Sequence, residues 1–191
     1  MEIDLNAIAG DVVADLVQTA SSSPNERLPK EEQIRSRIYM NIRPLFSTVC
    51  LERAYLPIEV DGTKECDIWA RDKNGQELWI EIKRSWSIRS WNNKPNEQLR
   101  DWQTDIHKLS LAPLSSTRIF FLVGFTDCKI DLAPKAQNVD RLLALIAKLH
   151  APARVYENAY PFSWRSESIN QIGIWIWLWK PGLEIVKDGS V

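Results

Sequence analysis

Cysteine is scarce in this chain: its 191 residues contain only three, Cys50, Cys66 and Cys128. They are odd in number, scattered, and form no C-x-x-C pair, so neither a disulfide framework nor a cysteine zinc site is indicated. We therefore expect reduced thiols, as in a cytoplasmic protein. The seven glycines and ten prolines follow no repeat, which excludes collagen-like and low-complexity classes.

Long hydrophobic runs are also missing. The longest, Ile119–Phe125 and Ile172–Trp179, are far shorter than the roughly 20 residues that a membrane-spanning helix needs. The N-terminus, Met-Glu-Ile-Asp, is acidic, whereas a signal peptide begins with a basic segment. These absences lead us to expect a soluble, cytoplasmic protein.

An excess of one charge is lacking as well, since the formal net charge is −1. A general coating protein for polyanions is therefore disfavoured, although a local basic patch is not. What is present is a hydrophobic content of 45% and nine tryptophans, enough for one well-buried domain of this length. We expect an N-terminal helix and loop over residues 1–25 and a single domain over residues 26–191.

The spacing of apolar residues predicts an α/β domain with a mixed sheet flanked by helices. Helical periodicity predicts helices over residues 1–20, 30–43, 96–111 and 139–149. Apolar runs bounded by turn residues predict strands over residues 47–55, 66–71, 77–84, 118–125 and 173–179.

Two of these strands form a predicted hairpin across the turn at residues 72–76. A three-residue loop with Gly75 in the left-handed region pairs Arg71 with Glu77. Side chains alternate between the faces of a strand, so this register puts Asp67 and Glu81 on one face. A loop shorter by one residue would place them on opposite faces.

Asp67, Glu81 and Lys83 are the residues of this hairpin that indicate chemistry. Two neighbouring carboxylates repel each other unless a cation lies between them. A hard divalent ion such as Mg²⁺ prefers oxygen ligands of this kind, and a lysine beside it can help a water attack a phosphate. The alternative is an exposed hairpin face with mixed charges.

The string Asp67-(x13)-Glu81-x-Lys83 resembles the PD-(D/E)xK nuclease superfamily, and the predicted order of elements over residues 28–126 matches that family's αβββαβ core. The resemblance implies a restriction-endonuclease-like fold, in which Asp67 and Glu81 bind Mg²⁺ or Mn²⁺ and Lys83 assists the attacking water. Cys66 replaces the proline of the family motif, which is not a ligand.

In that family an acidic residue of the first helix often completes the site, and Glu31 is our choice for it. On a helical wheel Glu31 falls within the apolar stripe of Ile34, Ile38 and Ile42, whereas Glu32 falls outside it. A carboxylate on a buried stripe needs a cation. The alternative is a first-turn glutamate that merely favours the helix dipole.

The segment after the second hairpin strand, residues 83–94, is basic and contains Trp86 and Trp91. Basic side chains bind phosphates and aromatic rings stack on bases, so we expect Arg84 and Arg89 to bind nucleic acid. The alternative is a loop whose tryptophans cover the core.

Gln98 lies on the predicted helix 96–111, and similar nucleases often place a polar helix residue near the scissile phosphate. We therefore include Gln98 among the nucleic-acid-binding residues, ahead of Gln103. Either glutamine could instead be solvated.

Taken together, these residues predict a Mg²⁺-dependent DNA endonuclease, aided by a homodimer contact or a partner protein in holding DNA. One alternative is an inactive nuclease-fold module that binds nucleic acid or a partner protein, and another is an unrelated α/β interaction domain. The choices between DNA and RNA, duplex and single strand, and repair, restriction, transposition and phage-related roles stay open, as does sequence specificity. Phosphate-binding glycine motifs and a nucleophile elbow are absent from the sequence.

Overall fold

The computed structural model describes residues 3–22, 30–55, 64–85, 95–126, 154–161 and 171–185. The elements within these residues are, in chain order, α1 (Leu5–Ser22), α2 (Glu31–Ile42), β1 (Thr48–Ala54), β2 (Glu65–Arg71), β3 (Glu77–Ser85), α4 (Pro95–Leu109), β4 (Thr117–Thr126), β5 (Arg154–Pro161) and β6 (Gln171–Trp179). The predicted helix over residues 139–149 lies outside the described residues. Among the helices described here, none has the length and apolar character needed to cross a membrane.

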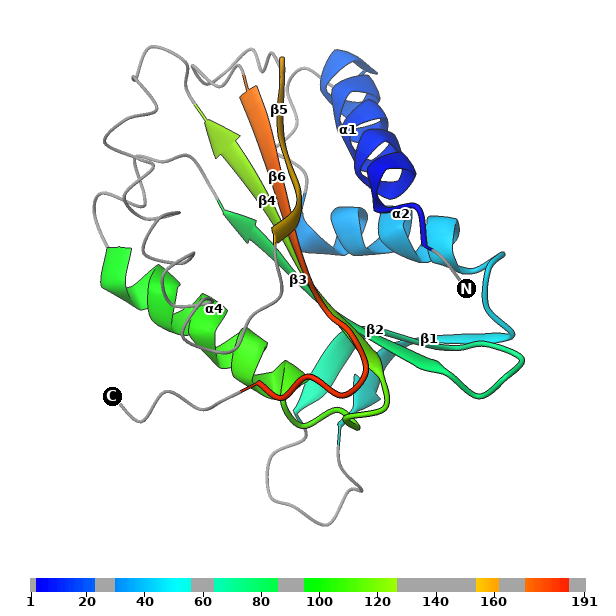
Figure 1. Ribbon diagram of the computed structural model, residues 1–191. Coiled ribbons are helices and arrows are strands. Elements are labelled where there is room, and N and C mark those ends of the chain that lie inside the picture. Colours follow the sequence, from blue (N-terminus) through cyan, green and yellow to red (C-terminus); the bar gives the residue numbers. More distant parts are fainter. Residues whose placement is uncertain are drawn as a thin grey trace.

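The strands form one mixed sheet in the order β1-β2-β3-β4-β6-β5. Only β3 and β4 run parallel, and α4 makes the crossover between them. Helices α1 and α2 cover one face of the sheet, and α4 covers the other (Figure 1). The predicted α/β class with a mixed sheet flanked by helices is therefore confirmed.

Strand β5 was not among the predicted strands. Among the described strands it is at the edge of the sheet and pairs only with β6. Its sequence, Arg-Val-Tyr-Glu-Asn-Ala-Tyr-Pro, alternates poorly and ends at a proline, so local periodicity alone gives a weak strand signal. The hydrogen-bonded pairing with β6 stabilises this strand, although its local sequence pattern does not predict it.

Alternation along the strands divides the core into two layers. Ile68, Ile80 and Ile82 point toward α1 and α2, where the apolar side of α1 belongs to the same cluster. Trp69 and Trp79 point the other way, toward α4.

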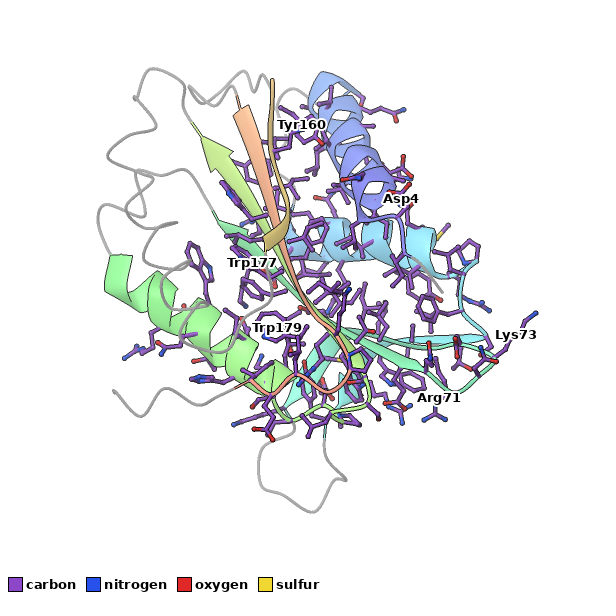
Figure 2. All side chains as sticks on the ribbon, in the orientation of Figure 1. Asp4, Arg71, Lys73, Tyr160, Trp177 and Trp179 are labelled. Carbon is purple, nitrogen blue, oxygen red and sulfur yellow. The ribbon has the colours of Figure 1, made fainter. Side chains whose placement is uncertain are left out.

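The tryptophans of β6 lie on the α4 face of the sheet. Trp177 and Trp179 are buried there, between the sheet and α4 (Figure 2). Because a fully buried tryptophan ring removes a large apolar area from water, β6 is held firmly under this helix.

The hairpin between β2 and β3 has the predicted register. Arg71 lies opposite Glu77 and Trp69 opposite Trp79. Gly75 has a φ of 79°, which a side chain would disfavour. The prediction of a three-residue loop is confirmed, and with it the placement of Asp67 and Glu81 on a common face.

Candidate functional site

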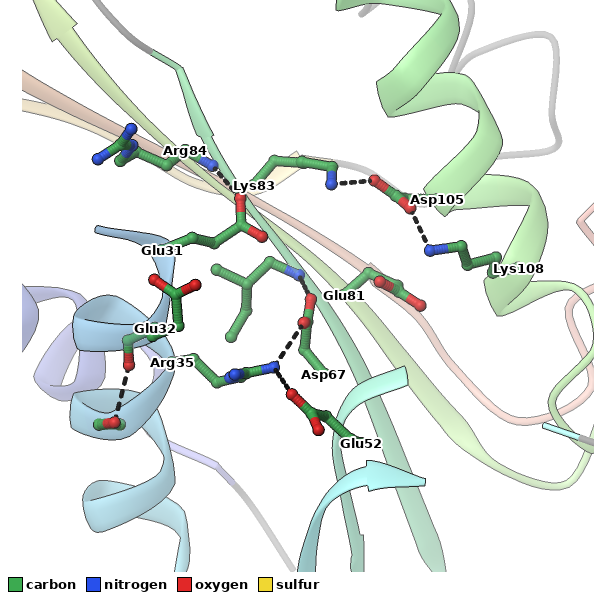
Figure 3. Close-up of polar contacts among 12 residues, drawn as sticks. Glu31, Glu32, Arg35, Glu52, Asp67, Glu81, Lys83, Arg84, Asp105 and Lys108 are labelled. Atoms are coloured by element: carbon green, nitrogen blue, oxygen red, sulfur yellow. Dashed lines mark hydrogen bonds and ion pairs between the residues drawn. The ribbon is translucent and has the colours of Figure 1, made fainter. Parts of the chain in front are cut away.

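The candidate site lies where β2 and β3 separate. The paired residues of the two strands end at Ile68 and Ile80. Beyond this point two carboxylates accept hydrogen bonds from backbone N–H groups of β3. Ile82 N–H donates to Asp67 Oδ2 at 2.7 Å, and Arg84 N–H donates to Glu31 Oε2 at 3.1 Å (Figure 3). Side chains from β2 and α2 thus replace a neighbouring strand, and this brings both acids to β3.

Asp67 is partly buried and has charged neighbours on two sides. Its Oδ1 lies 3.5 Å from Arg35 Nη1. Burial raises the pKa of Asp67, although the Ile82 N–H, Arg35 and Lys83 act in the opposite direction. The carboxylate is therefore harder to ionise than an exposed aspartate when no further cation is present.

Glu81 is the most deeply buried acid of the site, with 2% of its surface exposed. It lies on the α4 side of the sheet, where the Tyr55 hydroxyl donates to its Oε1 at 2.7 Å. Burial, followed by repulsion from Asp67, raises the pKa of Glu81 to about 9. Without a cation, this side chain is a neutral carboxylic acid at pH 7.

Tyr55 was missed by the sequence reasoning. Its ring stacks on Trp79 with 4.9 Å between centroids, which aims the hydroxyl at Glu81. Burial, with repulsion from Glu81, raises the pKa of Tyr55 well above its ordinary value, so the hydroxyl keeps its proton and donates. Nothing in the spacing of residues 55 and 81 signals this contact.

Lys83 is two residues beyond Glu81 on the same face of β3, and its ammonium group is held by α4. Lys83 Nζ lies 2.8 Å from Asp105 Oδ2, and Lys108 Nζ lies 2.6 Å from Asp105 Oδ1. Burial acts to lower the pKa of Lys83, but the ion pair with Asp105, together with attraction to Glu31 and Asp67, outweighs burial and the pKa is raised. Lys83 is thus held as a cation.

Glu31, the first residue of α2, is turned toward the site, whereas Glu32 is exposed. Burial raises the pKa of Glu31, with Lys83 and the Arg84 N–H opposing and Asp67 adding to the rise. The helical-wheel argument therefore chose the acid that faces β3. The carboxylate is close enough to Lys83 and Asp67 for their charges to act on its pKa, in opposite directions.

Arg35 and Glu52 extend the site toward β1. Glu52 is on β1 between Leu51 and Arg53, which pair with the residues on either side of Asp67 in β2. Its φ of 54° is the only positive value at a non-glycine residue in the described part of the chain. Such a conformation costs about 1–3 kcal/mol. It accompanies an ion pair of 2.8 Å between Glu52 Oε1 and Arg35 Nη1, the guanidinium that also approaches Asp67.

The predicted nucleic-acid-binding residues are only partly placed. Arg84 is half-buried next to Glu31, and burial lowers the pKa of its guanidinium, with Glu31 and Glu32 opposing. Gln98 is on α4, but its side chain lies outside the described part, as does Arg89 with the rest of the basic segment.

Asp67 and Glu81 have the carboxylate oxygens that a hard divalent cation prefers, but the described residues do not form a complete set of metal ligands. No group of three histidine, cysteine, aspartate or glutamate side chains in the described part of the chain is arranged to hold a metal ion. Asp67 and Glu81 nonetheless share a face, and each has a pKa raised by the charge or burial that a bound cation would counteract. Oxygen donors of this kind suit Mg²⁺ or Mn²⁺.

Comparison with protein-family models, with curated protein sequences and with solved structures gives no match for this chain.

The raised pKa values predict how the metal-free protein responds to pH. The folded-state pKa of Glu81, about 9, lies above its ordinary 4.5, so its contribution to stability is present at acidic pH and is lost as the pH rises toward 9. Tyr55 and Lys108 keep their protons over this window, because the pKa of each is raised from an ordinary value of 10 or more. We expect the melting temperature in EDTA to fall between pH 5 and pH 9, and to fall less with Mg²⁺. A flat profile in EDTA would contradict the buried, repelling carboxylates.

Proposed function

We propose that this protein is a Mg²⁺- or Mn²⁺-dependent nuclease that hydrolyses phosphodiester bonds in DNA and has the restriction-endonuclease-like core. The observation that carries the proposal is the convergence of Asp67, Glu81 and Lys83 on one face of β2 and β3, where the two strands separate. Glu31 joins them from α2.

The order of elements supports the same proposal. From α2 to β4 the chain runs helix, strand, strand, strand, helix, strand, with the last two strands parallel and joined by α4. This is the αβββαβ order that the resemblance to the PD-(D/E)xK superfamily leads us to expect. Asp67 and Glu81 lie just beyond the last paired residues of β2 and β3, where the two strands diverge.

In this proposal the chain binds a cation and orients the phosphate. Asp67 and Glu81 would hold Mg²⁺ or Mn²⁺, and the ion would supply Lewis acidity for a phosphate oxygen and for water. Glu81 must release its proton to serve as a ligand, and Tyr55 continues to donate to its Oε1. The Lys83 ammonium stabilises the negative charge that develops as a water oxygen attacks phosphorus and the ester oxygen leaves.

A second candidate, a binding module that cuts nothing, is favoured by one observation. Arg35 lies 3.5 Å from Asp67, so a guanidinium already supplies part of the positive charge that Asp67 needs. In an inactive protein this arrangement would be permanent. In an active one the metal must bind beside it.

The direct test is incubation with plasmid and single-stranded DNA in Mg²⁺, Mn²⁺ or EDTA. We expect nicking or cutting that requires the divalent ion and stops in EDTA. If the protein cuts no nucleic acid with either metal, the nuclease proposal fails. DNA binding without cleavage would then support the binding module.

The two glutamates at the start of α2 provide a matched pair of variants. Glu31→Gln keeps an oxygen for the Arg84 N–H but removes the charge that faces Asp67, and we expect cleavage to fall on the order of tenfold to 10²-fold. Glu32→Gln alters an exposed side chain and should leave the rate within about twofold. Single-turnover rates with Mg²⁺ measure the difference, and equal rates would place Glu31 outside the reaction.

A further inference from the structure

Asp105 is a buried charge that the sequence motif does not include. It lies on the inner side of α4 with 3% of its surface exposed, between the buried Trp102 and Leu109 on the helix surface. A carboxylate at such a place is strongly disfavoured unless cations pair with it. Both of its oxygens have such a partner, Lys83 on one side and Lys108 on the other.

The geometry makes Asp105 an anchor for Lys83 in particular. Lys83 comes from β3, so its ion pair of 2.8 Å with Asp105 joins the sheet to α4 (Figure 3). A lysine side chain has four rotatable bonds, and without a partner its ammonium group samples many positions. Lys108, from the next turn of α4, contacts the other oxygen at 2.6 Å and keeps the carboxylate from turning away from Lys83.

We infer that Asp105 is a positioning residue of the phosphodiester hydrolysis proposed above: it holds the Lys83 ammonium at the place where charge develops on the phosphate. The inference depends on the proposed function, because it gives the lysine of the motif the support that fixes it. It also explains why a charge is retained in an otherwise apolar helix face. Apolar residues would pack there at lower cost.

The test is a double-mutant cycle with Asp105→Asn, Lys83→Ala and the double variant, under single-turnover conditions with Mg²⁺. We expect Asp105→Asn to lower the cleavage rate on the order of 10²-fold, as for a misplaced reacting group. In the Lys83→Ala background the same change should have almost no effect, because the residue that Asp105 positions is already gone. Affinities for DNA and for Mn²⁺ should stay within about twofold of the parent's, since Asp105 touches neither.

Asp101→Asn is the matched control, because Asp101 lies one turn earlier on α4 and is exposed. It should cleave at the parental rate. A rate for Asp105→Asn within threefold of the parent's, or an equal loss in both backgrounds, would overturn the inference, because the second result is what a purely structural role produces. Activity lost with Asp105→Asn and largely restored with Asp105→Glu would support it.

A second readout does not require cleavage. An ammonium group held in an ion pair exchanges its protons slowly enough to be seen in ¹H–¹⁵N spectra of lysine side chains, and Lys83→Arg assigns the signal. We expect this signal in the parent and in Asp101→Asn, and its loss in Asp105→Asn. An unchanged signal in Asp105→Asn overturns the inference even if that variant is too unstable to assay. If the parent protein cuts no nucleic acid with any metal, the proposed function is wrong, and the positioning role of Asp105 is wrong with it.

Discussion

Replacing Glu81 by glutamine will abolish cleavage and at the same time stabilise the metal-free protein at pH 8. Glu81 is buried, and its pKa of about 9 reflects burial and repulsion from Asp67. Glutamine has the same shape and keeps an oxygen for the Tyr55 hydroxyl, but it carries no charge and binds a hard cation poorly. This single substitution is therefore expected to lower the cleavage rate and to raise the stability of the metal-free protein.

We expect the loss of a metal ligand to reduce the cleavage rate by about 10³-fold or more. Calorimetry should show weaker Mn²⁺ binding, and thermal unfolding in EDTA should show a higher melting temperature than the parent's at pH 8. The gain should shrink at pH 5, near the ordinary pKa of 4.5, because the unfolded chain then also begins to hold the Glu81 proton and folding requires less proton uptake. Cleavage at the parental rate would remove Glu81 from the metal site, and a lower melting temperature at pH 8 would contradict the raised pKa of its buried carboxyl group.

Replacing Lys83 by alanine will have a different signature. Lys83 is not a ligand, so Mn²⁺ should still bind, and tighter binding would follow from the loss of a like charge near Asp67. The cleavage rate should nevertheless fall on the order of 10²-fold to 10³-fold, because the ammonium group that stabilises the charge developing on the phosphate is gone. Parallel calorimetry and single-turnover assays measure the two effects.

Lys83→Arg should restore little of this activity. A planar guanidinium is bulkier than an ammonium group and differs in its donor geometry, and Asp105 already pairs with the ammonium groups of two lysines. If Lys83→Ala cuts as fast as the parent, the lysine is a surface charge and the motif is a coincidence. Recovery of full activity by arginine would mean that only the positive charge matters.

The hairpin and the start of α2 are the parts that sequence reasoning predicted best. The register follows from the short loop with Gly75 at its end, since one residue more or less would turn every side chain of β3 to the other face. The choice of Glu31 over Glu32 follows from helical geometry in the same way. Both depend on interactions within a few residues.

Asp105 could have been found by the same argument, because it lies on the buried stripe of α4 beside Trp102 and Leu109. A charged residue in that stripe needs a partner of opposite sign. The helical wheel indicates that such a partner exists, but not that it is Lys83. That pairing required the position of β3 under the helix.

The sequence by itself determined which faces of β2, β3 and α2 carry acids, because side-chain direction follows from local periodicity. Only the tertiary structure decided what those acids contact. Tyr55 reaches Glu81 across 26 positions in the chain, and Glu31 reaches the Arg84 N–H across 53. Such partners meet because the sheet and its two helical layers pack together, and no local spacing records which distant backbone or side-chain group will fill a given gap.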